Sequence, residues 1–256
     1  MESEPLNAAD TVASTVHGSC CPIMELRQYT LRSAEARETL IELFEREFVE
    51  SQEAVGMQII GTFRDLQKPD RFVWLRGFQD MESRAAQLQQ FYGGQIWKKH
   101  REVANATMID SDNVLLLRLA PDTAGFDLTN AVRPEPGAGK TSADVIVAVI
   151  YYLKPGTEPA FADRFQKSIA PILRERGVNV GAQLVSEHHP NTFPALPVRE
   201  DANVFVWFTS VADPEAVCAL PLGKILPHLR EHLTAQPELL LLEPTDRSLV
   251  RQLRKS

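Results

Sequence analysis

Apolar and polar positions follow two different periods along the first part of the chain. Residues 23–31, "IMELRQYTL", alternate and are rich in strand-forming side chains, which predicts a β-strand. Residues 33–55 instead carry apolar side chains three and four positions apart, at Leu40, Leu43, Phe44 and Phe48, which predicts an amphipathic helix. We therefore expect the folded region to open with a strand followed by a helix.

The same kind of pattern continues with two strands, a second helix and a fourth strand, at residues 56–66, 71–78, 80–110 and 113–120. The connection between the two middle strands is short, so they should form a hairpin. The second helix is expected to begin at an Asp80 N-cap and to break at Gly93 and Gly94. The predicted order, β-α-β-β-α-β, is that of a ferredoxin-like unit.

The chain then repeats itself. "FVWLRGFQD" at 72–80 recurs as "FVWFTSVAD" at 205–213, an offset of 133 residues. Three more blocks recur in the same order: "QYTLR" as "YYLK", "VGMQII" as "VGAQLV", and "GQIWKKHREVANA" as "GKILPHLREHLTA", at offsets of 122, 125 and 129 residues. Four blocks in one order predict an internal duplication, and the differences between the offsets indicate small loop insertions.

The repeat predicts both the domains and the fold class. We expect a disordered tail at 1–22, a first domain at 23–120, a linker at 121–143, a second, diverged domain at 144–245 and a C-terminal tail at 246–256. A ferredoxin-like unit covers only one face of its sheet with helices. Two such sheets can cover each other, so we predict an α+β protein whose tandem ferredoxin-like repeats form an intrachain dimeric α/β barrel.

Composition excludes several classes of partner. The 34 Asp and Glu outnumber the 27 Lys and Arg, and the pI is about 5.5, which leaves no basic surface for nucleic acid or an anionic membrane. Neither a membrane span nor a targeting peptide is evident, and three cysteines do not make a disulfide framework. We expect a cytoplasmic protein, and the sequence leaves further association of the intrachain barrels into a homo-oligomer open.

The segments "MELRQYTL", "VGMQIIGTF" and "RFVWLRGFQDMESRAAQLQQFYGGQIWKKHREVAN" together resemble a NIPSNAP-type domain. The resemblance is close over residues 23–120 and looser over 144–244. It implies the dimeric α/β-barrel superfamily, whose members include cofactor-independent monooxygenases, haem-degrading enzymes and small-molecule lyases. It implies the fold more than the chemistry.

Strand periodicity places a group of charged and aromatic side chains on one face of the first sheet. Glu25, Arg27 and Tyr29 share one side of their strand, and Trp74, Arg76 and Phe78 share one side of theirs. Helices need an apolar face, so we expect this charged face to line the barrel interior. Either the charges only neutralise one another, or an arginine binds a substrate carboxylate or enolate while Tyr29, Trp74 and Phe78 surround its apolar body.

The second copy helps to separate architectural from functional residues. At the positions of Glu25, Arg27 and Arg76 it has Val147, Val149 and Thr209, whereas the aromatic residues remain as Tyr151 and Trp207. The shared aromatic residues indicate architecture, with Tyr151 and Trp207 as further candidate ligand contacts. The unshared charges indicate one functional pocket, in the first half.

Histidines offer weaker candidates. His100 lies on the second helix, where a pocket acid, base or haem-ligand role competes with that of a half-buried structural histidine. His228 and His232 have a metal-compatible spacing, but no third ligand stands nearby, so no metal is expected.

These observations lead to one functional prediction and two alternatives. The protein is expected to bind a small aromatic or acyl compound in the barrel interior without a cofactor, with cofactor-independent acid/base or oxygenase chemistry as a further option. The alternatives are a non-catalytic scaffold with a filled barrel and, more weakly, a haem-binding protein.

Overall fold

A computed structural model describes residues 21–139 and 143–253. Apart from Cys21 and Pro22, the tail expected at 1–22 lies outside the described residues. No helix in the described part of the chain is long and apolar enough to cross a membrane.

The first half contains the predicted elements in the predicted order. They are β1 (Ile23–Leu31), α1 (Ala34–Leu43), the π-helical turn η1 (Phe44–Phe48), α2 (Val49–Glu53), β2 (Gln58–Asp65), β3 (Arg71–Phe78), α3 (Met81–Gly93), α4 (Gln95–Thr107) and β4 (Met108–Leu119). Asp80 caps α3 as expected, since its carboxylate accepts the Ser83 N–H at 2.6 Å. The break at Gly93 and Gly94 separates α3 from α4. β4 begins five residues before the predicted strand at 113–120.

The second half repeats this order with less regular helices. It contains β5 (Val145–Tyr152), α5 (Glu158–Arg164), the π-helical turn η2 (Phe165–Ile169), α6 (Ala170–Glu175), β6 (Gln183–Ser186), β7 (Val204–Val211), the 3₁₀ turn η3 (Glu215–Ala219), α7 (Leu222–Leu229), the 3₁₀ turn η4 (Arg230–His232) and β8 (Glu238–Pro244). Pro227 lies inside α7 and removes a helical hydrogen-bond donor, which is one reason why this helix is short.

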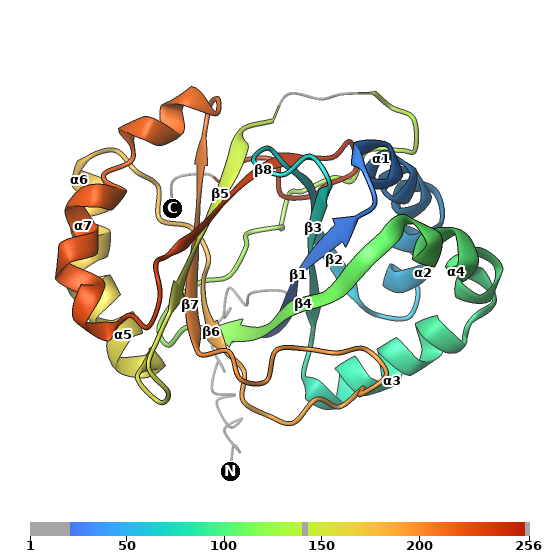
Figure 1. Cartoon of the computed structure of the whole chain (residues 1–256), viewed down its shortest axis with the longest axis horizontal. Coiled ribbons are helices and arrows are strands. Elements are labelled where there is room, and N and C mark those ends of the chain that lie inside the picture. Colours follow the sequence, from blue (N-terminus) through green and yellow to red (C-terminus); the bar gives the residue numbers. More distant parts are fainter. Residues whose placement is uncertain (1–20, 140–142, 254–256) are drawn as a thin grey trace, which may run out of the picture.

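The eight strands close into one barrel in the order β1-β3-β2-β8-β5-β7-β6-β4, with every neighbour antiparallel. Figure 1 shows the strands at the centre of the molecule, between two groups of helices. Eight residue pairs join β1 to β3, and eight join β5 to β7. Only three pairs join β2 to β8, and three join β4 to β6, so the two seams between the halves are short.

Strand register is the same in both halves at the positions matched in the sequence. The pairs Glu25–Arg76, Arg27–Trp74 and Tyr29–Phe72 in the first half correspond to Val147–Thr209, Val149–Trp207 and Tyr151–Phe205 in the second. The closed α/β barrel is therefore present in the chain. Descent of its halves from one duplicated unit stays a prediction that this register supports.

The barrel interior is filled with apolar side chains. Inward-facing residues such as Met24, Leu26 and Ala148 form one buried cluster to which all eight strands contribute. Placing Glu25, Arg27 and Arg76 in the barrel interior was therefore wrong. An eight-stranded barrel is just wide enough for side chains to fill it, so its interior needs the apolar face of each strand and leaves the charged face to the helices.

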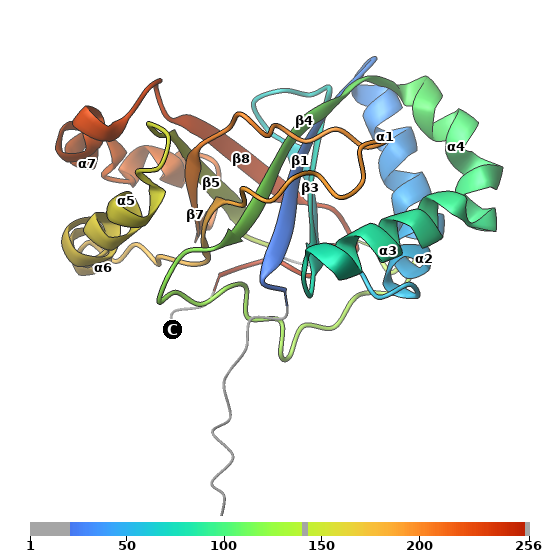
Figure 2. The ribbon, with the colours of Figure 1, turned by 90° about the horizontal axis from the view of Figure 1, so that it is seen from below.

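The outer faces of the two sheet halves are covered by separate helix layers. Helices α1 to α4 lie on one side of the barrel and α5 to α7 on the other, as Figure 2 shows from below. Each layer packs its own apolar cluster against the sheet, including Phe44, Phe48 and Trp74 in the first half and Phe161, Phe165 and Trp207 in the second. The molecule thus has three cores: one inside the barrel and one under each helix layer.

Trp207 tests this arrangement in the second half. It is fully buried, and its ring lies 5.6 Å from that of Phe165. We expect Trp207→Ala to lower the free energy of unfolding by about 3–5 kcal/mol, as a large-to-small core substitution. Ligand binding in the first half should persist under native conditions. Denaturant unfolding measures the first effect and ligand titration the second; an unchanged unfolding midpoint would contradict the assignment of Trp207 to a close-packed core.

Candidate functional site

A buried ionic cluster lies between the first half of the sheet and its helix layer. Glu25 on β1 accepts hydrogen bonds from three arginines: Arg27 Nη1 at 2.7 Å, Arg76 Nε at 2.8 Å and Arg84 Nε at 2.7 Å. All four residues have 0% exposed surface. Arg27 and Arg76 come from paired strands, and Arg84 reaches down from α3. The three arginines therefore converge on one carboxylate away from water.

The cluster carries more positive than negative charge. Arginine stays protonated in proteins, so three guanidinium groups face a single carboxylate, and two positive charges remain uncompensated within it. Burial alone would raise the pKa of the Glu25 carboxyl, but the three arginines lower it well below its ordinary value. Glu25 is therefore ionised at neutral pH. Gln52 supplies one more acceptor, to Arg76 Nη1 at 3.1 Å, without adding charge.

Four buried donors of this region make no hydrogen bond among the described residues: Nη2 of Arg27, Arg76 and Arg84, and Trp74 Nε1. Arg76 Nη2 and Arg84 Nη2 each lie 2.7 Å from a Glu25 oxygen as ion pairs, so Arg27 Nη2 and Trp74 Nε1 are the two with no partner there. Tyr29 is different, because its oxygen accepts a hydrogen bond from Arg27 Nε at 2.8 Å. Burial raises the pKa of Tyr29, so its phenol stays neutral and keeps a proton to donate elsewhere. Unpaired buried donors are unfavourable unless something accepts from them. The cluster thus presents donors without acceptors.

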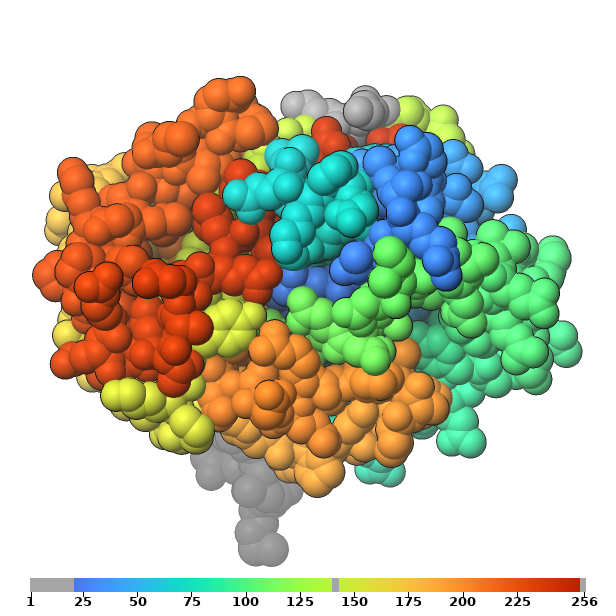
Figure 3. All heavy atoms as spheres, in the orientation of Figure 1, coloured from blue at the N-terminus to red at the C-terminus, as the bar shows by residue number. Residues whose placement is uncertain are grey.

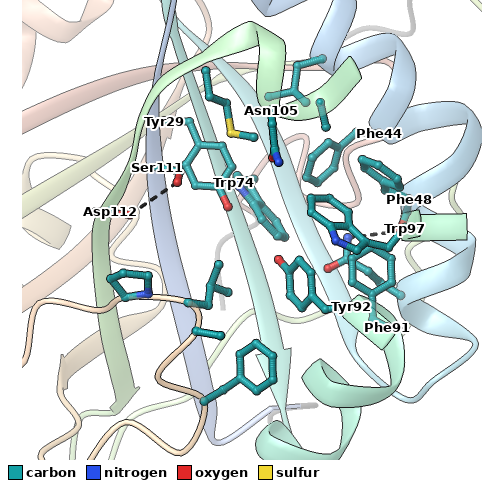
Figure 4. Close-up of a pocket in the computed structure, with 18 residues that line it drawn as sticks. Tyr29, Phe44, Phe48, Trp74, Phe91, Tyr92, Trp97, Asn105, Ser111 and Asp112 are labelled. Carbon is teal, nitrogen blue, oxygen red and sulfur yellow. Dashed lines mark hydrogen bonds between the residues drawn. The ribbon is translucent and has the colours of Figure 1, made fainter. Parts of the chain in front are cut away.

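An aromatic pocket of about 390 Å³ opens next to these donors. Its deep wall includes Tyr29, Trp74 and Gln52, and Figure 4 shows Tyr29 and Trp74 at its centre, facing Tyr92 and Trp97. Helices η1, α3 and α4 supply most of the rings, and β4 supplies the polar Ser111 and Asp112. The lining residues are Tyr29, Leu40, Phe44, Phe48, Gln52, Trp74, Phe91, Tyr92, Trp97, Ala104, Asn105, Met108, Ser111, Asp112, Phe193, Ala195, Leu196 and Pro197.

The last four lining residues come from the second half of the chain. They belong to the β6–β7 loop, residues 187–203, which crosses beside β4 to reach α3. In Figure 3 this segment, in orange, lies against the green spheres of the first half. Phe193 stacks on Tyr92, with ring centroids 5.8 Å apart and planes 20° from parallel. The pocket of the first half is therefore completed by the second.

The matched aromatic residues of the second half lie in a buried apolar cluster. Tyr151 contacts the rings of Phe161 and Phe205, and Trp207 contacts Phe165, within one buried cluster. Burial raises the pKa of Tyr151 to about 12. Tyr151 and Trp207 thus lie under the other helix layer, away from the pocket that holds Tyr29 and Trp74. The structure brings together only the first-half members of the predicted set.

The remaining candidates lie around the pocket or outside it. Phe78 is buried under the cluster, with the guanidinium carbon of Arg76 5.5 Å from its ring centre. His100 Nε2 lies 3.5 Å from Glu47 Oε2, and His100 is not one of the residues lining the pocket. The described residues contain no group of three or more His, Cys, Asp or Glu placed to hold a metal ion, and this includes the neighbourhood of His228 and His232.

Sequence reasoning missed Arg84 and most of the aromatic wall. Arg84 lies in "MESRAAQLQQF", where a single arginine in an amphipathic helix has the appearance of a solvent-facing residue. The available signal was the apolar Leu88 at i+4, which the structure buries and which indicates that Arg84 shares the inward face of α3. No local pattern could show that Phe193 reaches the pocket, because that contact joins distant parts of the chain.

Comparisons with known proteins agree with this fold. The NIPSNAP family model matches residues 24–123, so the first half contains a NIPSNAP domain. A putative monooxygenase from Fusobacterium nucleatum subsp. nucleatum is 10% identical, with a TM-score of 0.56 over 92% of this chain and 98% of its own. An anthrone oxidase-like protein is 12% identical, with a TM-score of 0.54 over 90% of this chain and 96% of its own.

At these identities the two structures establish a shared barrel fold over nearly the whole chain. No curated protein matches the sequence.

The role of Glu25 can be tested through stability. We expect Glu25→Gln to lower the free energy of unfolding at pH 7 by about 3–5 kcal/mol, because it leaves three buried guanidinium groups without a counter-charge. The folded pKa of Glu25 lies below its unfolded value of about 4.3. The contribution of Glu25 to the free energy of unfolding is therefore complete above the unfolded pKa, and it is lost as the pH falls toward the folded pKa. Glu25→Gln should remove this part of the acid dependence.

Glu38→Gln is the matched control. Glu38 also pairs with two arginines, Arg37 and Arg64, but its side chain is 41% exposed. An exposed pair contributes little, so this variant should cost less than about 1 kcal/mol. Equal losses for the two variants in urea unfolding at pH 7 would show that the Glu25 cluster behaves as a surface ion pair.

Proposed function

We propose that this protein binds a small aromatic or acyl compound with an anionic or enolisable oxygen, in the pocket between the first half of the sheet and its helices. The observation that carries the proposal is the buried surplus of positive charge, with unpaired donors on Arg27 and Trp74, next to an aromatic pocket. A cavity of about 390 Å³ is in the range of small-molecule sites.

The arrangement suits a ligand with an apolar body and a negative end. The rings of Phe44, Phe91, Tyr92 and Trp97 surround the body of the pocket. Tyr29 stands at the deep wall, backed by the Arg27 guanidinium, whose carbon is 5.4 Å from the tyrosine ring centre. A ligand carboxylate or enolate oxygen at this wall would accept a hydrogen bond from the Tyr29 O–H and face the surplus charge. The charged groups themselves are fully buried, so water screens their attraction for such an oxygen less than it would at the protein surface.

The same geometry defines the chemistry that the site could support. A neutral phenol held by a cation is an oxyanion stabiliser: it donates a hydrogen bond as negative charge develops on a ligand carbonyl oxygen. Tyr29 would take this role, with Arg27 as the group that orients its oxygen. Enolate formation, which is common to proton-transfer and cofactor-independent oxygenation reactions, is the step such a wall favours. The proton that leaves the ligand carbon needs a base, and Asp112 is the carboxylate in the pocket lining that would take it. The names of the solved monooxygenase-like and oxidase-like structures are compatible with this class of chemistry.

A non-catalytic scaffold is the second candidate, and the filled barrel interior favours it. The buried cluster inside the barrel involves apolar residues from all eight strands, as a purely architectural barrel would have. The hollow region under the first helix layer distinguishes the two functions, since a scaffold has no need of a cavity with unpaired donors. The pocket lining offers a haem iron tyrosine and methionine side chains but no imidazole or thiolate, and a haem is not the ligand that we propose.

Binding of 2-naphthoate, an aromatic carboxylate, tests the proposal. We expect Arg27→Val, which installs the residue of the second copy, to weaken binding by about 1.5–3 kcal/mol, the range of a charge-assisted hydrogen bond. Arg76→Thr should act in the same direction. Isothermal titration with 2-naphthoate measures the loss of binding free energy in each variant. The same titration with the neutral 2-naphthalenemethanol shows whether that loss depends on the negative charge of the probe. If Arg27→Val weakens the two probes equally, or neither probe binds the wild-type protein, the anion site is wrong.

Native mass spectrometry of the purified protein addresses the same question without choosing a ligand. A retained compound of a few hundred daltons, lost from a Trp97→Ala variant, is the expected result, because Trp97 forms part of the aromatic wall. If the protein has the mass of the bare chain and binds neither 2-naphthoate nor 2-naphthalenemethanol, the non-catalytic scaffold is favoured.

A further inference from the structure

The β6–β7 loop is longer than its counterpart in the first half. The offset between matched blocks rises from 125 residues at Val55 and Val180 to 133 residues at Phe72 and Phe205, so the second copy has gained eight residues between them. These added residues fall in the loop that reaches the pocket. The second half, which lacks the charged cluster, therefore has a longer loop, and this loop lies over the pocket of the first half.

The base of the loop is fixed to the sheet. Glu187 N–H donates to the Leu116 carbonyl and Arg199 N–H donates to the Val114 carbonyl, each at 2.9 Å. Both acceptors lie on β4, the strand at the seam between the halves. The loop thus leaves the sheet and returns to it at neighbouring points, and its tip is the part that covers the pocket.

The tip is held by a different set of contacts. Arg84 Nη1 donates to Asn191 Oδ1 at 3.0 Å and to Thr192 Oγ1 at 3.1 Å. Thr192 Oγ1 donates in turn to the Met81 carbonyl at 3.1 Å, and Phe193 stacks on Tyr92. The loop residues that make these contacts are partly or fully exposed, whereas Arg84 itself is buried, and the contacts all go to α3 and not to the barrel. The tip can therefore separate from α3 while the base of the loop stays on the sheet.

Arg84 joins this tip to the ionic cluster. One edge of its guanidinium binds Glu25, and the remaining nitrogen binds the loop. Because Glu25 also holds Arg27 and Arg76, Arg84 can be removed without leaving the carboxylate unpaired. Arg84 therefore shares the role of compensating Glu25 with two other arginines. Of the three, it is the one that donates hydrogen bonds to Asn191 and Thr192 in the loop.

We propose that the β6–β7 loop is a lid that controls exit of the ligand from the first-half pocket, and that Arg84 is the positioning residue that holds the lid closed over an occupied site. The proposal takes its ligand from the proposed function. The opening and closing of the β6–β7 loop can be measured without any ligand. Since Phe193, Leu196 and Pro197 form the outer wall, the lid sets the size of the ligand that can be enclosed.

The test uses two variants that release the tip in different ways and one control. Thr192→Val removes the hydrogen bonds of the Thr192 hydroxyl to Arg84 and Met81. It leaves the Arg84–Glu25 pair and the Arg84–Asn191 hydrogen bond intact. Phe193→Ala removes the ring stacked on Tyr92. Asp201→Ala is the control, because Asp201 lies in the same loop with an exposed side chain and is not one of the residues lining the pocket. Arg84→Met is a third releasing variant, used if denaturant unfolding shows it to be folded.

Stopped-flow measurement with 2-naphthoate separates the rates. Thr192→Val and Phe193→Ala should each raise the dissociation rate constant by roughly 2–10-fold, which corresponds to the loss of one hydrogen bond or one aromatic pair. The association rate constant should change less. Asp201→Ala should match the wild type. A variant that merely destabilised the fold would leave the dissociation rate unchanged under native conditions. Unchanged dissociation rates in both releasing variants would overturn the lid.

A second readout needs no ligand. Acrylamide quenching of tryptophan fluorescence should increase in both releasing variants, because opening of the tip exposes Trp97 and Trp74, whereas Trp207 under the other helix layer stays protected. Hydrogen exchange at residues 191–196 should accelerate several-fold, with β5 unaffected. If 2-naphthoate fails to bind the wild type, the proposed function is wrong in its ligand, and these measurements still decide the lid: no change in quenching or exchange overturns it.

Discussion

Closure of the sheet determines where the polar chemistry of this protein can lie. An eight-stranded barrel has an interior that side chains fill, and here apolar residues such as Met24, Leu26 and Phe208 fill it. Because successive side chains of a strand alternate between faces, the charged residues of β1 and β3 are then forced outward, beneath the helices. The helix layer of the first half meets them with Arg84 of α3, and the pocket lies beside them. The position of the ionic cluster follows from this geometric constraint, and the pocket and the loop lie next to that cluster.

The fold was predictable from the sequence to a large extent, because its signals are local. The periods of β1 and of the helix after Ser33, the Asp80 cap and the glycine break each act within a few residues, and the structure has them where they were expected. The repeat supplied the long-range information, since two one-sided sheets of the same design have an obvious way to cover each other. The shorter, less regular helices after Asp213 were harder to predict, because Pro227 weakens the helical pattern there.

The site was predictable in composition but not in position. Glu25, Arg27 and Arg76 do meet Tyr29 and Trp74, and alternation was sufficient to group them. The choice between the two faces failed because it assumed that helices require a wholly apolar surface. A buried carboxylate shared by three arginines satisfies most of its own polar groups, so it can lie under helices. Arg84 and Phe193 could not be found by periodicity, since each reaches the site from an element whose packing depends on the tertiary structure.

The extra length of the β6–β7 loop, which covers a pocket in the other half of the chain, bears on how such a site can evolve. In a barrel made from two identical subunits, every substitution appears twice, and a loop that closes one cavity must also close the other. Here both sheets belong to one chain, so a codon change alters one side only. One half can therefore carry the charges and the cavity, while the other carries apolar residues at the matched positions and a long loop that reaches its neighbour. Covalent linkage of the halves thus permits a division of labour that strict two-fold symmetry forbids.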